Sequence, residues 1–422
     1  MKKQPNSRIF LTLVSLGASL EYYDFVVYAM LSPYLNRAFF PDSQSEIPYL
    51  HTLGLFSVGY IARPFGGILF GSLGDRFGRR VTFVSVMLLM TLSTLLIGLL
   101  PTYSQIGAIS GLLLILLRFF QGLSFGGELP GAITVVSEQT SPNKYGFHCG
   151  IIMSSVAFGS ILASLVLQLL SRILTEEEIL RWGWRCPFLF GGVLAIVSFA
   201  IRVSMQETRS ARKPGEHRIP IISLFKFHPL EVLLGSAIVL FPSALIVFML
   251  YIPEYFSKYF NYALPDIYFS NTFSLLWAAC CLPVFGLLSD RIGPTRILMA
   301  TSFLFCLFIF PMFELVSEQS VACLALFLIL IQTFIAALVT SYLPLLVTLF
   351  PESVRFTGIA FCYNIAYVLA GLTPGLFNFF LSKNFSHNLI FTTHFMTGVV
   401  ALFSIIQLNA VRKRKYLRLS EP

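Results

Sequence analysis

Charged side chains inside apolar stretches are the residues of this sequence best suited to chemistry. Glu21 and Asp24 stand three residues apart in one such stretch, so a helix places them on one face. Two carboxylates this close in a medium of low dielectric repel each other, and one of them then favours holding a proton near neutral pH. A carboxyl with this property is what proton coupling requires. We interpret the pair as a proton or substrate site, with an ion pair to another helix's arginine as the alternative.

A second group follows one face of a later apolar run. Arg118, Gln121, Phe125 and Glu128 step by three, four and three residues. At 3.6 residues per turn they fall within a sector of about 80°. Such a stripe suits a water-filled centre, where Arg118 could bind an anionic group of a substrate. The alternative is a structural ion pair between helices, because charges buried in membranes commonly pair.

Other polar side chains in apolar runs are weaker candidates. Arg63 precedes a proline, and structural pairing or substrate contact explains it equally well. Tyr28 lies one turn after Asp24. In the second half the candidates are neutral, and Tyr363, Asn364 and Tyr367 form the favoured group, although aromatic side chains taken singly often just pack. Since the charged groups lie in the first half, we expect protons to be handled there.

The composition indicates which elements position these residues. Of 422 residues, 56% are apolar and 12% are charged, with a mean hydropathy of +0.78. Soluble chains carry about 25% charged residues. Twelve apolar runs approach or exceed the roughly 20 residues that a helix needs to cross a bilayer, and they are too long and evenly apolar for barrel strands. The sequence predicts an all-α membrane protein with twelve transmembrane helices.

The basic residues fix a predicted orientation. Of 29 Lys and Arg residues, 21 fall in segments on one side of the predicted membrane and 6 on the other; Arg63 and Arg118 lie within apolar runs. This bias predicts a multi-pass protein of the cytoplasmic (inner) membrane with both termini cytoplasmic. The net charge of +9 therefore reflects topology, and no nucleic acid partner is expected. The seven cysteines form no metal spacing and no disulfide framework, so neither a metal nor a cofactor is expected.

A short charged loop occurs twice. Gly71-Ser-Leu-Gly-Asp-Arg-Phe-Gly-Arg-Arg80 and Gly286-Leu-Leu-Ser-Asp-Arg-Ile-Gly-Pro-Thr-Arg296 align at a constant offset of 215 positions, close to half the chain. The duplication predicts two pseudo-symmetric six-helix bundles. The predicted parts are residues 1–204 (first bundle), 205–228 (basic cytoplasmic linker), 229–411 (second bundle) and 412–422 (basic cytoplasmic tail).

With these loops, the chain resembles the major facilitator superfamily, and more narrowly its metabolite:H⁺ symporters, which include proline/betaine, citrate, α-ketoglutarate and shikimate permeases. Besides the loops, the resemblance rests on Leu20–Phe25, Ala62–Gly67, Arg118–Gly122, Gly126–Glu128, Trp182–Phe188, Glu207–Thr208, Phe350–Gly358, Tyr363–Asn364 and Pro374. It implies secondary transport by alternating access, driven by the proton gradient. It also implies that Asp75 bonds the start of the eleventh helix, near Val354–Thr357, and that the loop arginines meet acids at cytoplasmic helix ends, with Glu138 as the candidate.

We refer to the residues of this implied device as the latch residues: Gly71, Asp75, Arg76, Gly78, Arg79, Arg80, Glu138, Asp290, Arg291 and Arg355. The sequence departs from the family pattern after Glu138, where Lys144 and Tyr145 replace a basic pair. The chain also stops soon after its last helix, without the coiled coil of the osmosensing members, so osmosensing is not expected.

Together these patterns predict a proton-coupled symporter for uptake of a small polar metabolite, either an organic acid or a zwitterionic amino acid or betaine. Its predicted partners are that metabolite, protons and the lipid bilayer, and it is expected to act as a monomer. An intramembrane enzyme is not expected, since no nucleophile–base pair appears at membrane depth. An exporter, a siderophore or drug permease, and a non-transporting sensor or scaffold remain the alternatives.

Overall fold

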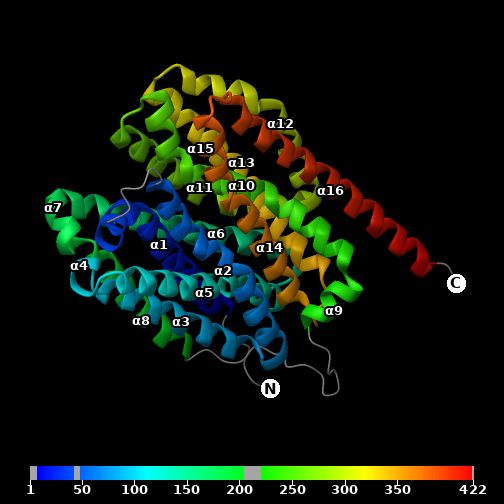
Figure 1. The fold of residues 1–422 in the computed structure, drawn as a ribbon. Helices are drawn as coiled ribbons and strands as arrows, with labels where there is room; N and C mark the ends of the chain where they lie inside the picture. The colour runs from blue at the N-terminus through cyan, green and yellow to red at the C-terminus, as the bar shows by residue number, and fades with distance from the viewer. Residues whose placement is uncertain (1–6, 42–47, 204–219, 421–422) are drawn as a thin grey trace. The chain divides into compact units, whose positions relative to one another are not determined.

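A computed structural model describes residues 7–41, 48–203 and 220–420, with only the backbone described at some positions within these ranges. The described chain consists of helices and their connections, without strands, and this confirms the predicted all-α class (Figure 1). Nine helices in these ranges are long and apolar enough to cross a membrane. In lipid a helix satisfies its own backbone hydrogen bonds, so these apolar runs fold as helices.

The chain divides into two compact units. The first comprises Met1–Gln139 and Ile152–His217, and the second comprises Thr140–Ile151 and Arg218–Pro422. The helices that precede the predicted linker are α1 (Ser7–Phe39), α2 (Pro48–Phe77), α3 (Arg79–Leu99), α4 (Tyr103–Ile106), α5 (Ile109–Gln139), η1 (Pro142–Lys144), α6 (Tyr145–Ile173), α7 (Glu176–Glu178), η2 (Ile179–Gly183) and α8 (Arg185–Val203). Helix α6 therefore begins in the second unit and continues in the first.

The remaining helices belong to the second unit. They are α9 (Pro220–Phe227), α10 (Pro229–Phe260), α11 (Leu264–Ile292), α12 (Pro294–Ser317), α13 (Val321–Leu349), α14 (Arg355–Gly371), α15 (Thr373–Ser382) and α16 (Asn388–Ser420). Most of the predicted linker lies outside the described residues, and its last part forms α9. The predicted tail is helical to Ser420, because the Leu, Lys and Arg residues that follow the apolar span are good helix formers.

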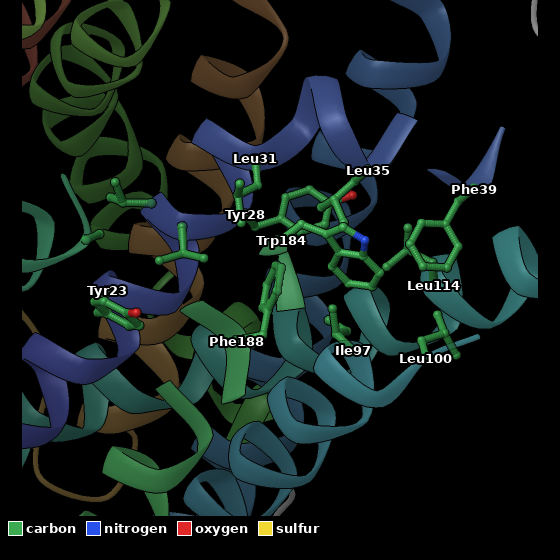
Figure 2. Close-up of a cluster of buried hydrophobic side chains, with 13 residues drawn as sticks. Tyr23, Tyr28, Leu31, Leu35, Phe39, Ile97, Leu100, Leu114, Trp184 and Phe188 are labelled. Carbon is green, nitrogen blue, oxygen red and sulfur yellow. The ribbon is translucent and has the colours of Figure 1, made fainter. Parts of the chain in front are cut away.

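An apolar core fixes α1 within the first unit. Tyr28, Leu31 and Leu35 of α1 lie against Trp184 and Phe188 at the start of α8 (Figure 2). The Trp184 ring packs edge to face on Phe188 at a centroid distance of 6.3 Å, and it is fully buried. The core therefore holds the α1 segment that carries Asp24 and Tyr28.

Helices α2 and α5 are in backbone contact in the same unit. A Cβ atom added at Gly66 would overlap the Leu123 carbonyl oxygen, and one added at Gly126 would overlap the Arg63 carbonyl oxygen. Only glycine permits two helices to approach this closely. This approach fixes the place of Arg63 relative to the polar face of α5.

Both copies of the charged loop contain, just before the next helix, a glycine with a positive φ angle. Gly78 precedes α3 with φ 99° and Gly293 precedes α12 with φ 104°. Side chains other than glycine rarely adopt this left-handed backbone, so both positions require glycine. The pair was aligned from the sequence, and the two residues share the same conformation.

Candidate functional site

The first unit buries each charged residue that the sequence predicted for its site. Glu21 and Asp24 on α1, Arg63 on α2, and Arg118 and Glu128 on α5 are all at most 3% exposed. Tyr28 and Gln121 are buried in the same unit. Helix α5 packs on both α1 and α2, so the predicted residues come from adjoining helices.

A chain of hydrogen bonds joins the arginine of this group to a carboxylate. Arg118 Nη1 donates to Gln121 Oε1 at 2.8 Å, and Gln121 Nε2 donates to Thr94 Oγ1 at 2.8 Å. The Thr94 hydroxyl then donates to Asp24 Oδ2 at 2.7 Å. We call these four residues the relay. Every donor in it points toward the Asp24 carboxylate, so the positive and negative ends are electrostatically connected across α5, α3 and α1.

Thr94 was missed by sequence reasoning. It lies in the apolar run of α3, it is fully buried, and it carries no charge that would single it out. The other Asp24 oxygen, Oδ1, faces α8, where a Cβ atom at Gly191 would overlap it. Gly191 thus leaves the space that this carboxylate occupies.

Aromatic rings surround both buried arginines. The Arg118 Cζ atom lies 3.5 Å from the centroid of the Tyr28 ring. The Arg63 Cζ atom lies 3.9 Å from the Phe125 centroid and 4.3 Å from the Tyr60 centroid. Cation–π contacts of this kind stabilise a desolvated guanidinium by roughly 2 kcal/mol. They help to hold a positive charge in an apolar interior.

Among the described residues, the Arg118 guanidinium donates a hydrogen bond to Gln121 Oε1, and its Nε has no hydrogen-bond partner. It makes no ion pair within that part of the chain. These residues therefore do not form the direct ion pair between helices that the sequence left open as the alternative role of Arg118.

A small cavity borders the two arginines. Its volume is about 10 Å³, and Phe25, Arg63, Met90, Arg118, Gln121 and Phe125 are among its lining residues. A volume of this size holds roughly one water molecule. This space is too small for a metabolite, so binding one beside the two arginines requires lining side chains to move.

The neutral candidates of the second unit lie together on α14. Tyr363, Asn364 and Tyr367 are at most 1% exposed. The two tyrosine rings are 4.6 Å apart between centroids, and Asn364 Nδ2 donates to the Ala360 carbonyl one turn earlier at 2.8 Å. That these residues meet the charged group of the first unit stays a prediction.

The predicted latch residues differ in their surroundings. Asp290 accepts backbone hydrogen bonds from Gly146 N at 2.7 Å and Phe147 N at 2.8 Å, at the first turn of α6. The sequence did not predict this partner. Gly71 and Asp75 are buried, Arg76 and Arg291 are exposed, and Glu138 is half-buried.

Two latch predictions are left untested by these contacts. The side chains of Arg79 and Arg80 lie outside the described part of the chain, so their pairing with Glu138 stays a prediction. The bond from Asp75 to the start of α14 would join the two units and also stays a prediction. Arg355 Nε donates to the Phe350 carbonyl at 3.3 Å, within its own turn.

Comparisons with known proteins show the family of this chain. Residues 14–374 match the profile of the Major Facilitator Superfamily. The chain is 33% identical over 386 residues to the inner membrane metabolite transport protein YhjE of Escherichia coli strain K12, covering 87% of each chain. It is 32% identical to the shikimate transporter of the same organism, over 85% of this chain and 84% of that one. It is 30% identical to the proline/betaine transporter of Salmonella typhimurium, over 94% and 81%.

A solved structure extends the likeness to the fold. The proton:xylose symporter XylE superimposes with a TM-score of 0.79 over 94% of both chains, at 16% sequence identity. At this identity the likeness concerns the fold alone. With the family match, it confirms the predicted twelve-helix architecture and the multi-pass inner membrane location.

Proposed function

This chain belongs to the Major Facilitator Superfamily and is a transporter, and from that premise we propose that it takes up a small polar metabolite by symport with protons. The relay carries the proposal, because it links a cation that can bind an anionic substrate group to a carboxylate that can bind a proton. Shikimate, proline and betaine, named for the relatives, all bear a carboxylate.

The relay determines whether the binding of an anion promotes or opposes the binding of a proton. When an anionic group binds Arg118, it competes with Gln121 for the guanidinium and neutralises the positive charge that favours ionised Asp24. Asp24 then takes up a proton more readily, so the anion and the proton promote each other's binding. By linkage the effect is reciprocal, and each ligand raises the affinity for the other by the same factor. Positive coupling of this kind favours the carrier that holds both ligands, which is the form that a symporter translocates.

Release follows from the same coupling. Where the proton concentration is low, Asp24 loses its proton. The restored carboxylate again accepts the Thr94 hydroxyl, and the hydrogen bonds of the relay form again as far as Arg118. The Arg118 guanidinium then returns to Gln121 and the anion is released. The fixed aromatic contacts of Arg118 and Arg63 keep both cations in place during this exchange.

Uptake into proteoliposomes tests the function. Purified protein is reconstituted and given an inside-alkaline pH gradient, with radiolabelled carboxylates, amino acids and betaines as the panel. We expect accumulation of at least one compound that collapses when a protonophore is added. Flux without any dependence on the gradient, or the absence of flux for the whole panel, contradicts the proposal.

Thr94→Val should weaken the coupling without removing either charged end. Valine has nearly the shape of threonine but can neither donate to Asp24 nor accept from Gln121. A hydrogen bond to a charged group contributes about 1.5–3 kcal/mol, so the pH dependence of substrate affinity should shrink by roughly 10-fold or more. The measurement is the dissociation constant by calorimetry at pH 5.5 and pH 8.0.

Thr94→Ser is the matched control, because it keeps the hydroxyl and removes only a methyl group. We expect it to retain the wild-type difference between the two pH values. If Thr94→Val also retains it, the hydrogen-bond relay is not the route of coupling.

We also propose that Asp290 acts as a latch on α6. Its carboxylate accepts two N–H groups at the positive end of the helix dipole, a charge-assisted arrangement. The residues it binds belong to the second unit, whereas the later part of the same helix belongs to the first. A latch at this point restrains a helix that is shared by both units.

Asp290→Asn should slow transport and leave binding largely unchanged. Asparagine keeps one acceptor oxygen but loses the charge that the helix dipole favours, a contribution of roughly 0.3–1 kcal/mol. We expect the maximal uptake rate to change by a factor of about two to five, with the substrate dissociation constant within twofold of the wild type. The same pattern is expected for Asp75→Asn at the equivalent loop position. Loss of binding by folded protein would contradict the latch role in either variant.

A further inference from the structure

Helix α15 is a separate segment that continues α14 (Figure 1). One of the twelve apolar runs of the sequence covers residues 355–382, but α14 ends at Gly371 and α15 begins at Thr373. Pro374 has no N–H and cannot donate to the carbonyl four residues earlier, which weakens a helix at this point. The Thr373 hydroxyl donates to that carbonyl, Ala370 O, at 2.7 Å. The chain thus has a joint between the two helices, at which the Ala370 carbonyl keeps a donor.

Two buried apolar side chains attach α15 to the rest of its unit. Phe377 and Leu381 are 3% and 6% exposed, whereas Leu376 and Phe379 are more than half exposed. The Phe377 ring lies 6.4 Å from that of Tyr251 on α10, between centroids. Lipid is as apolar as these side chains, so their packing has no hydrophobic driving force in a membrane and holds a ten-residue helix only weakly.

A polar contact adds to this attachment at the middle of α15. Tyr251 Oη donates to Asn378 Oδ1 at 2.6 Å, and Asn378 Nδ2 donates to Glu254 Oε1 at 3.0 Å. Both partners belong to α10 and lie one turn apart, so a single amide group bridges them. We call these three residues the clamp.

The end of α10 also approaches the connection that follows α15. Tyr251 stacks on Tyr255 with ring centroids 5.7 Å apart, and the Tyr255 hydroxyl lies 3.0 Å from His387 Nδ1. Through these contacts the same face of α10 holds α15 at its middle and the chain beyond its end. No sequence pattern groups these residues, because the partners are more than 120 positions apart.

We propose that Glu254 and Asn378 are positioning residues of the transport cycle, which hold α15 against α10 in one conformation and release it in the other. The proposal rests on the proposed transport function. A bond of this kind suits reversible attachment, because water can replace each of its partners when α15 moves, whereas a packed apolar contact has no such substitute. In the predicted orientation the clamp lies at the outer end of α10, so its release would open the outer side.

Charge exchange within the clamp provides the test. Asn378→Asp places a second carboxylate beside Glu254, and like charges at this distance repel. Adding Glu254→Gln restores an amide–carboxylate pair with the two groups exchanged, and Tyr251 can still donate to Asp at 378. Glu254→Gln alone keeps an acceptor oxygen for Asn378. The expected order of disruption is therefore Asn378→Asp greatest, with Glu254→Gln alone and the double variant both close to wild type.

Two readouts separate positioning from general stability. Spin labels at Ser257→Cys on α10 and Phe379→Cys on α15, in a background without the native cysteines, report the distance between the two helices by pulsed electron resonance. We expect Asn378→Asp to shift the population to longer distances and to change the maximal uptake rate by fivefold or more, while KM changes less than twofold. The double variant should recover both readouts, and Asn388→Ala, an exposed asparagine of the same unit, should alter neither.

The proposal is overturned if the double variant is no better than Asn378→Asp, or if label distances are the same in all variants. The distance measurement needs no flux, so it tests the clamp even where the wild type fails to accumulate any compound. Failure of the wild type to accumulate a compound contradicts the proposed function, and unchanged distances contradict the clamp.

Discussion

Asp24→Asn is expected to abolish proton-driven accumulation while substrate still binds. Asparagine can keep an oxygen acceptor for the Thr94 hydroxyl, which now donates to Asp24 at 2.7 Å, but it cannot take up or release a proton. A gradient of two pH units, at about 1.36 kcal/mol per unit, drives accumulation of roughly 100-fold for one coupled proton. For the variant we expect a ratio of about 1, measured as the steady-state inside-to-outside concentration in proteoliposomes.

Exchange of labelled for unlabelled substrate provides the internal control. This reaction needs binding and conformational cycling but no net proton movement, so Asp24→Asn should retain it. If the variant still accumulates substrate against its gradient, Asp24 does not carry the coupled proton. Loss of exchange in folded protein would instead assign Asp24 to binding.

The other buried carboxyls of the first unit are matched comparisons. Glu21→Gln and Glu128→Gln each remove one ionisable group of the same buried site. Neither residue is a member of the relay, so we expect each variant to retain part of the accumulation. Should one of them abolish it while Asp24→Asn does not, the proton site lies at that carboxyl. Retention in all three variants would contradict a proton site in this group.

The polar stripe of α5 could be predicted because helical geometry alone determines it. Once residues 109–139 form a helix, Arg118, Gln121 and Glu128 must share a face, and all three are buried. Burial of Glu21 and Asp24 followed from the apolar run around them in the same way. These predictions use only local spacing, which one sequence contains.

Thr94 shows what local spacing cannot give. Threonines in the helices of this protein commonly donate to a carbonyl of the preceding turn, as Thr134 and Thr340 do. This habit lets them satisfy themselves in a membrane helix, so a threonine in an apolar run carries no signal. Thr94 differs only because α1 and α5 bring Asp24 and Gln121 to it. The packing of three helices decides its role.

The same limit applies to the repeated loop. The alignment of Asp75 with Asp290 could be read from the sequence, whereas the partner of Asp290, the first turn of α6, could not. Gly146 and Asp290 are 144 positions apart, and no periodicity connects them. A motif therefore identified the residue that makes the contact, and the fold identified what it contacts.

Gly126→Ala should strongly destabilise the first unit. The added methyl group would overlap the Arg63 carbonyl oxygen and lie 2.8 Å from Gly67 N, so it meets the backbone of α2 on both sides. Backbone cannot change rotamer, and α2 must move away from α5. Overpacking costs typically 1–3 kcal/mol and more where nothing can yield, which exceeds the gain of about 1 kcal/mol in helix propensity. We expect a lower thermal unfolding midpoint and a lower yield of folded protein in the membrane.

Gly98→Ala is the matched control in the same unit. Its Cβ atom would lie 3.0 Å from Leu189 Cδ2 and 3.2 Å from Phe188 Cβ, which are side-chain atoms, and the Leu189 contact is the end of a flexible side chain. A change within about 1 kcal/mol is expected there, because the side chain can adjust and alanine favours the helix. Equal midpoints for Gly126→Ala and the wild type, measured by the thermal shift of detergent-solubilised protein, would contradict the direct backbone contact. Because Arg63 belongs to that contact, its displacement would also move a cation of the candidate site, so a surviving Gly126→Ala protein should bind substrate more weakly than Gly98→Ala.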